Sequence, residues 1–270
     1  MQTTDLPDIN TEYELPSEAV QKYQFDGYLV LPEVADTDTV RQYHQVIKQT
    51  ALEHNTQEQS LEERDTYGKA FLQITNLWEK NADVKTFVLA KRFAGIAARL
   101  MGVDNVCLYH DQALFKEPGG GHTPWHQDGY YWPIDARQTI TMWMPLVDVS
   151  EGMGTLKFAS GSHQDGYLND LPISNESHQV FEEYINEKGY SIQSSGNLQA
   201  GDASFHNGWT LHAAPGNNSD TLREAFTIIY YADGLTIREP RNENQQLDLE
   251  TWFPGQIPGE KAVSRLNPIL

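Results

Sequence analysis

Short hydrophobic stretches alternate with polar, turn-forming residues through the second half of the chain. Two of these stretches, 139–144 and 224–231, are rich in β-branched and aromatic residues, which favours strands. Glycine and proline cluster between the hydrophobic stretches and predict turns at 118–121, 151–154 and 215–216. Many short strands separated by such turns, from Cys107 onward, are typical of a β-sandwich or a jelly roll.

The first hundred residues carry helical signals instead. The pattern predicts a short helix over 17–22 and helical structure over 82–101 in two pieces, and Asp36 or Asp38 can cap a further helix. Residues 164–195 form a polar insertion between two core strands, helical around 179–188, which serves as a lid or decorates one rim. We therefore expect one domain over residues 1–270, mainly β with flanking helices, in which 1–16 is a flexible lead-in.

Length and cysteine content are consistent with this single domain. The 270 residues are enough to bury a substantial core, and no apolar run approaches the roughly 18 residues of a membrane span. No basic, apolar targeting sequence opens the chain. The single cysteine, Cys107, rules out an intrachain disulfide, so we expect a cytoplasmic protein in which Cys107 is a core residue.

The charge balance limits the partners. The chain has 38 acidic against 19 basic residues, for a formal net charge of −19. Phosphate affinity needs clustered cations, so the composition argues against nucleic acid and against a large polyanion such as an acyl-CoA. We expect a small-molecule substrate, while oligomeric state is left open.

The triplet His126-Gln127-Asp128 and the distant His212 carry the candidate chemistry. Residues two apart on a strand share a face, so His126 and Asp128 can converge on one ion while Gln127 turns away. His212 has to come from another strand. Two imidazoles and one carboxylate on one side of a metal are the facial triad of non-heme Fe(II) oxygenases.

Arg223 extends this set. Turn formers fill 215–220, and a hairpin turning at Asn217-Asn218 would return Arg223 to the neighbourhood of His212. A guanidinium grips a carboxylate through two parallel hydrogen bonds. Together with the triad, Arg223 therefore points to an enzyme that consumes 2-oxoglutarate (2OG) and O2.

The triplet recurs as His163-Gln164-Asp165, so either copy could hold the metal. The second copy follows a turn-like run, 159–162, where alternate residues need not face the same way, and we favour the first copy. The remaining candidates, His110, His122 and His206, are interpreted as structural groups or as groups that orient the ligands.

Several separate stretches then resemble the phytanoyl-CoA dioxygenase (PhyH) family of Fe(II)/2OG-dependent oxygenases. These stretches occur in the family's order between residues 20 and 233: 25–32, 108–112, 116–118, 123–128, 161–163, 201–202, 206–212, Asn217 and Arg223. The resemblance implies a double-stranded β-helix, which is a cupin-like jelly roll, with an entry strand near 25–32 and a helix over about 39–54.

The resemblance also implies roles for individual residues. It implies that His126, Asp128 and His212 bind iron and that Arg223 holds the distal carboxylate of 2OG. Gln112 resembles a residue close to the co-substrate. Trp132 matches a substrate-contacting aromatic residue, and Trp143 matches a tryptophan near the site, although a core role is favoured for Trp143.

The neighbouring aromatic residues Tyr130 and Tyr131 are expected beside Trp132 on the substrate side. Their faces can hold an apolar group or an organic cation, or can simply fill the mouth of the barrel. One position departs from the family pattern: many members have Ser or Thr two residues after the distal histidine, where this chain has Ala214. The second anchor for 2OG must then come from elsewhere, for which Thr123 and Thr227 are candidates.

We therefore predict an Fe(II)- and 2OG-dependent dioxygenase that hydroxylates a C–H bond of a small metabolite. Desaturation, cyclisation or halogenation at the same site remain alternatives, although halogenases on this scaffold replace the carboxylate that Asp128 retains. Two other classes are a zinc-dependent hydrolase, which would have no use for Arg223, and a cupin-like binding protein, which would not need the intact triad. The substrate cannot be named from the sequence.

Overall fold

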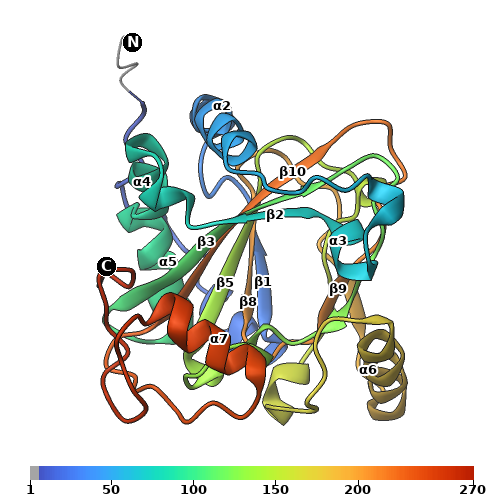
Figure 1. The fold of residues 1–270 in the computed structure, drawn as a ribbon. Coiled ribbons are helices and arrows are strands. Elements are labelled where there is room, and N and C mark those ends of the chain that lie inside the picture. Colours follow the sequence, from blue (N-terminus) through green and yellow to red (C-terminus); the bar gives the residue numbers. More distant parts are fainter. Residues whose placement is uncertain (1–5) are drawn as a thin grey trace.

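Two antiparallel β-sheets face each other in the computed structural model, which describes residues 6–270 (Figure 1). The larger sheet has the strand order β1-β8-β5-β10-β3-β2, and the smaller sheet has the order β4-β9-β6-β7. The strands are β1 (Tyr28–Leu31), β2 (Leu72–Thr75), β3 (Val106–Lys116), β4 (Thr123–His126), β5 (Thr139–Pro145), β6 (Lys157–Ala159), β7 (Ile192–Ser194), β8 (Ala203–Asn207), β9 (His212–Ala214) and β10 (Arg223–Ala232).

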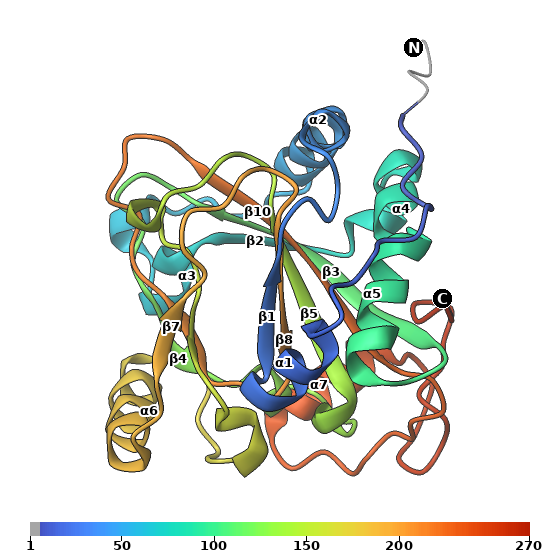
Figure 2. The same ribbon diagram turned by 180° about the vertical axis from the view of Figure 1, so that it is seen from behind.

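Helices cover the outer face of the larger sheet and flank the smaller one (Figures 1 and 2). The α-helices are α1 (Ala19–Asp26), α2 (Thr37–Glu53), α3 (Thr66–Ala70), α4 (Ala82–Val88), α5 (Lys91–Met101), α6 (Asn175–Lys188) and α7 (Glu243–Trp252). The apolar face of α5, with Phe93, Ile96 and Leu100, packs in one buried cluster with residues of α2, α4 and the larger sheet. This cluster fixes the larger sheet from outside and leaves its inner face free to form the site.

The helix predictions are confirmed with shifted ends. Helix α2 begins after Asp36, whose side chain accepts a hydrogen bond from the Thr39 N–H, so Asp36 and not Asp38 is the cap. The expected helical segment 82–101 is divided into α4 and α5. Helix α1 begins two residues and ends four residues later than the predicted 17–22, and it is capped by Gly27, which has a φ of 79°. The strands predicted at 139–144 and 224–231 are β5 and most of β10.

The flexible lead-in predicted over 1–16 is wrong for the part that the structure describes, while residues 1–5 lie outside it. Ile9 is 2% exposed and belongs to the main hydrophobic cluster. The Tyr13 hydroxyl donates a hydrogen bond to the Pro32 carbonyl, and the Arg92 side chain donates to the Thr11 carbonyl. A buried apolar side chain and these hydrogen bonds together hold the segment against the rest of the domain. Within residues 6–270, no helix combines the length and the apolar composition that crossing a membrane requires.

Candidate active site

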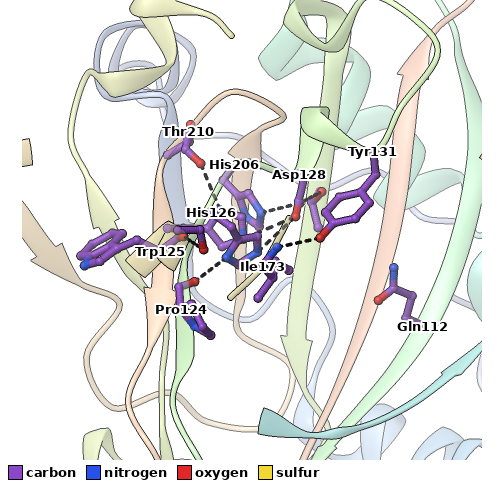
Figure 3. A network of polar contacts seen from close by, with 12 residues as sticks. Gln112, Pro124, Trp125, His126, Asp128, Tyr131, Ile173, His206 and Thr210 are labelled. Carbon is purple, nitrogen blue, oxygen red and sulfur yellow. Dashed lines mark hydrogen bonds and ion pairs between the residues drawn. The ribbon is translucent and has the colours of Figure 1, made fainter. Parts of the chain in front are cut away.

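Two paired strands of the smaller sheet bring the two histidines together. Strands β4 and β9 are antiparallel, and His126 lies directly opposite His212, so their ring centroids are 4.0 Å apart. Asp128 Oδ1 lies 3.5 Å from His126 Nε2 and 3.6 Å from His212 Nε2. One donor atom from each of the three residues falls within 4.8 Å of the others, which is close enough for one ion (Figure 3).

The expectation that His126 and Asp128 share one strand is wrong. Strand β4 ends at His126, and Asp128 begins a 3-10 turn, Asp128–Tyr130. Gly129 makes this turn possible, because its N–H donates to the Gly208 carbonyl and a Cβ there would lie 2.5 Å from the Ala136 Cβ. The tight turn, rather than the two-residue period of a strand, directs the carboxylate toward the histidines.

Backbone carbonyls orient both imidazoles. His126 Nδ1 lies 2.7 Å from the Pro124 carbonyl, and His212 Nδ1 lies 3.0 Å from the Thr210 carbonyl. Each ring therefore donates from Nδ1 and presents the Nε2 lone pair to the site. Burial, with the nearby His126 and His206 rings, also lowers the pKa of His212 well below its usual range. His212 is consequently neutral, as a metal ligand must be.

The outer oxygen of the carboxylate has its own partners. Asp128 Oδ2 accepts a hydrogen bond of 3.0 Å from the Thr141 hydroxyl. The same oxygen lies 3.2 Å from His206 Nε2 (Figure 3). Burial alone would raise the pKa of Asp128, but His212, His126 and His206 hold it well below its usual range. His206 thus takes the orienting role that the sequence suggested. Thr141 was missed, because nothing in the sequence places β5 opposite the turn that carries Asp128.

Gln127 turns away from the three ligands, as predicted. Its amide nitrogen donates to the carbonyls of Gly166 and Trp209, and its amide oxygen accepts the Leu168 N–H. The residue between the two ligands therefore fastens the start of the 164–195 insertion to the site.

The second copy of the triplet, His163-Gln164-Asp165, makes structural contacts away from the site. His163 lies in a 3-10 turn, 2.3 Å from where a Cβ on Gly27 would stand, and its Nε2 lies 3.2 Å from the Gln24 carbonyl. Asp165 accepts hydrogen bonds from the hydroxyls of Tyr184 and Tyr190. The structure therefore brings together the first triplet with His212 and leaves the second triplet outside.

The turn after His212 is not a hairpin, contrary to the prediction. Strand β9 pairs with β4 and β6 in the smaller sheet, whereas β10 pairs with β3 and β5 in the larger one. The connecting segment crosses between the sheets and is anchored by Asn217, whose amide donates to the carbonyls of Lys116 and Thr221. Arg223 still reaches the site, because the two sheets face each other across it.

Arg223 is a buried cation without an acidic neighbour. Its side chain is 2% exposed, none of the ion pairs in residues 6–270 includes it, and its Nε has no hydrogen-bond partner there. The guanidinium lies 5.3 Å from the centre of the Trp143 ring, and burial lowers its pKa to about 9, which leaves it charged at neutral pH. A buried unpaired charge is costly, so this position requires an anion to complete it.

A cavity of about 290 Å³ between the sheets connects the three ligands with Arg223. Eight other candidate residues from the sequence line it: His110, Gln112, Thr123, Tyr131, Trp132, Trp143, His206 and Thr227. Gln112 lies across the cavity from the triad in Figure 3. Ala214 also lines the cavity and offers no side-chain donor.

Tyr130 is the exception among these residues. It is absent from the cavity wall, its hydroxyl accepts a hydrogen bond from the Asn244 amide, and its carbonyl accepts one from Gln245. The 3-10 turn points its side chain toward α7, so of the two neighbouring tyrosines only Tyr131 lines the cavity.

The donor set and the buried cation fit an iron ion and a dicarboxylate. Two neutral imidazoles and one carboxylate would occupy one side of the ion and leave the other side open to the cavity. A dicarboxylate chelating the ion at one end would place its far carboxylate toward Arg223, whose charge lacks a partner.

Comparison with known proteins agrees with this geometry. The model of the phytanoyl-CoA dioxygenase (PhyH) family matches residues 23–225. The chain belongs to this family. As a PhyH protein it is an Fe(II)- and 2OG-dependent oxygenase, and the family resemblance drawn from the sequence is confirmed.

Three known proteins that resemble this chain are the following. The zebrafish (Danio rerio) phytanoyl-CoA dioxygenase domain-containing protein 1 is 25% identical over 288 aligned positions, which cover 89% of this chain and 98% of that protein. The alpha-ketoglutarate-dependent carbocyclase SnoK from nogalamycin biosynthesis superimposes with a TM-score of 0.78 at 24% identity, covering 95% and 97% of the two chains. The epimerase SnoN, solved with Fe3+, alpha-ketoglutarate and nogalamycin RO, gives 0.76 at 23% identity, with coverage of 93% and 97%. The predicted double-stranded β-helix is thereby confirmed.

Proposed function

We propose that this PhyH protein hydroxylates a C–H bond of a small-molecule metabolite. The observation that carries the proposal is the pairing of an intact His126–Asp128–His212 site with the unpaired Arg223 in one cavity. A zinc hydrolase would have no use for the buried guanidinium, and a binding protein would not need three converging ligands.

Separate residues of the site would bind the iron and orient 2OG. His126, Asp128 and His212 would hold the iron, and Arg223 would orient 2OG through its far carboxylate, with Thr123 or Thr227 as the second anchor in place of Ala214. Iron with 2OG and O2 supplies the oxidising power for C–H cleavage. Thr141 and His206 fix the plane of the Asp128 carboxylate, so that its Oδ1 stays directed at the ion.

The rest of the cavity wall would position the substrate and exclude water. Tyr131, Trp132 and Ile173 of the 164–195 insertion all line it. The Ile173 N–H donates a hydrogen bond of 2.9 Å to the Tyr131 hydroxyl, which ties the insertion to the wall. This contact supports a role for the insertion as a lid over the site.

The same site can serve other oxidations, and the carbocyclase and epimerase names of SnoK and SnoN make these the second candidate. Product analysis separates them: hydroxylation adds one oxygen atom from O2, whereas desaturation or cyclisation removes two hydrogen atoms and adds no oxygen. A halogenase is disfavoured, because Asp128 occupies the coordination position that a halide would need.

The proposed activity is tested by following succinate release from 2OG by the purified protein with Fe(II) and O2. We expect His126→Ala to lose this activity and His163→Ala, the matched change in the duplicate triplet, to retain it. The reverse result, or wild-type protein that forms no succinate with any small-molecule substrate tried, would contradict the proposal.

A further inference from the structure

Helix α7 adds a carboxylate to the cavity wall from beyond the region matched by the family model. Asp248 and Trp252 are four residues apart, so they share one face of α7, and both line the cavity. Leu249 and Phe253, on the adjacent face, are buried in a hydrophobic cluster with Tyr109 and Trp132. This packing fixes the helix, and therefore Asp248, against the wall.

Asp248 has no cationic partner among the described residues. It accepts a hydrogen bond of 2.7 Å from the Tyr109 hydroxyl, and none of the ion pairs in residues 6–270 includes it. Burial raises its pKa to about 7, against the opposing effects of hydrogen bonds with Tyr109 and Trp252. Two neutral donors do not balance a buried carboxylate, so a cation would be favoured beside it.

The charges in the loaded cavity leave Asp248 uncompensated. The two positive charges of Fe(II) and the one of Arg223 would cancel the charge of Asp128 and the two carboxylates of 2OG. His110, also on the wall, is neutral because burial lowers its pKa to about 3. Among the residues that line the cavity, Asp248 is then the carboxyl group left without a compensating cation.

Aromatic rings surround this space. Tyr67, Phe71, Tyr131, Trp132 and Trp252 all line the cavity. Their faces carry the negative side of the ring quadrupole, which attracts ammonium groups and binds them more tightly in a desolvated site. A carboxylate among aromatic faces attracts an organic cation, whereas it would repel an anionic or phosphorylated group.

We propose that the substrate of this enzyme carries a protonated amine or a related organic cation, which Asp248 and the surrounding aromatic faces bind while a C–H bond faces the iron site. This inference rests on the proposed function and names the substrate class of the same cavity. The cavity of about 290 Å³ must also hold 2OG, which restricts the substrate, or the part of it that enters, to a small molecule.

Three probes with one skeleton and different head groups test the inference: 3-phenylpropylamine, 3-phenylpropan-1-ol and 3-phenylpropanoate. Binding is measured by calorimetry without O2, on protein loaded with Fe(II) and 2OG. We expect the amine to bind at least about tenfold more tightly than the alcohol, and the carboxylate to bind most weakly, because one desolvated ion pair is worth at least that factor.

Asp248→Asn should remove the preference of the amine over the alcohol, and Glu250→Gln, which removes an exposed charge from the same helix, should keep it. The absorption band of the Fe(II)–2OG complex, measured on each protein, reports that the site is intact. The inference is overturned if the carboxylate probe binds as tightly as the amine, if the amine fails to bind, or if Asp248→Asn leaves the amine-to-alcohol ratio unchanged. Wild-type protein that shows no Fe(II)–2OG band would instead overturn the proposed function.

Discussion

Replacing Arg223 with methionine should stabilise the empty protein while it disables the binding of 2OG. The guanidinium is buried without an acidic partner, and its pKa is lowered to about 9. Since each tenfold change in an ionisation constant is worth about 1.4 kcal/mol, that lowering corresponds to a burial cost on the order of 5 kcal/mol. Attraction to the Trp143 ring returns about 2 kcal/mol of this.

The part of this burial cost that Trp143 does not offset predicts that Arg223→Met raises the free energy of unfolding by about 1–3 kcal/mol. Methionine fills similar space without a charge. In a protein of this size each kcal/mol shifts the melting temperature by about 2–4 °C. The affinity for 2OG should fall at least about 100-fold, since hydrogen bonds to a charged group contribute about 1.5–3 kcal/mol each and two are lost. Thermal unfolding of the metal-free protein and titration of 2OG into the Fe(II) protein without O2 measure the two effects.

Arg64 provides the matched control. It is also buried, but it pairs with Glu117 and donates to the Gln59 carbonyl. Arg64→Met should therefore lower the melting temperature, because it leaves a carboxylate and a carbonyl without their donor, and should leave 2OG affinity close to wild type. The reasoning is refuted if Arg223→Met destabilises the protein as Arg64→Met does, or if it binds 2OG with wild-type affinity.

Two further predictions concern the support of the site and the pH dependence of stability. Thr141→Val removes the hydroxyl that holds Asp128 Oδ2 and should weaken Fe(II) binding by about 10–100-fold in a metal titration. Thr141→Ser retains a hydroxyl and should keep the wild-type affinity for Fe(II). Equal affinities in the two variants would argue against this role of Thr141. Asp111 is fully buried, and burial raises its pKa to about 7, above the value in the unfolded chain. Its contribution to stability is therefore full below about pH 4 and is lost as the pH rises through about 7. Asp111→Asn should therefore flatten the fall in unfolding free energy between about pH 4 and 7 in urea titrations, and an unchanged slope would contradict the assignment.

The sequence predicted the parts of the fold that depend on local pattern. Stretches rich in β-branched and aromatic residues between turn formers identified β5 and β10, and the pair Asp36 and Asp38 marked the start of α2. The same local reasoning failed where tertiary packing decides the backbone. The turn that carries Asp128 depends on the close approach of Gly129 to Ala136, and the segment after His212 crosses between sheets instead of folding back.

For the site, residue type and order were sufficient to find the candidate ligands and Arg223, because their chemistry is specific. The groups around them were harder to find. Thr141 and Asp248 are ordinary residues in the sequence, and only the packing of β5 and α7 against the cavity gives them a role.

An anaerobic crystal structure with Fe(II) and 2OG tests the central claim most directly. The account predicts one iron ion bonded to His126, Asp128 and His212, with the far carboxylate of 2OG on Arg223. Iron bound at His163 and Asp165, or 2OG held with Arg223 left unpaired, would contradict it.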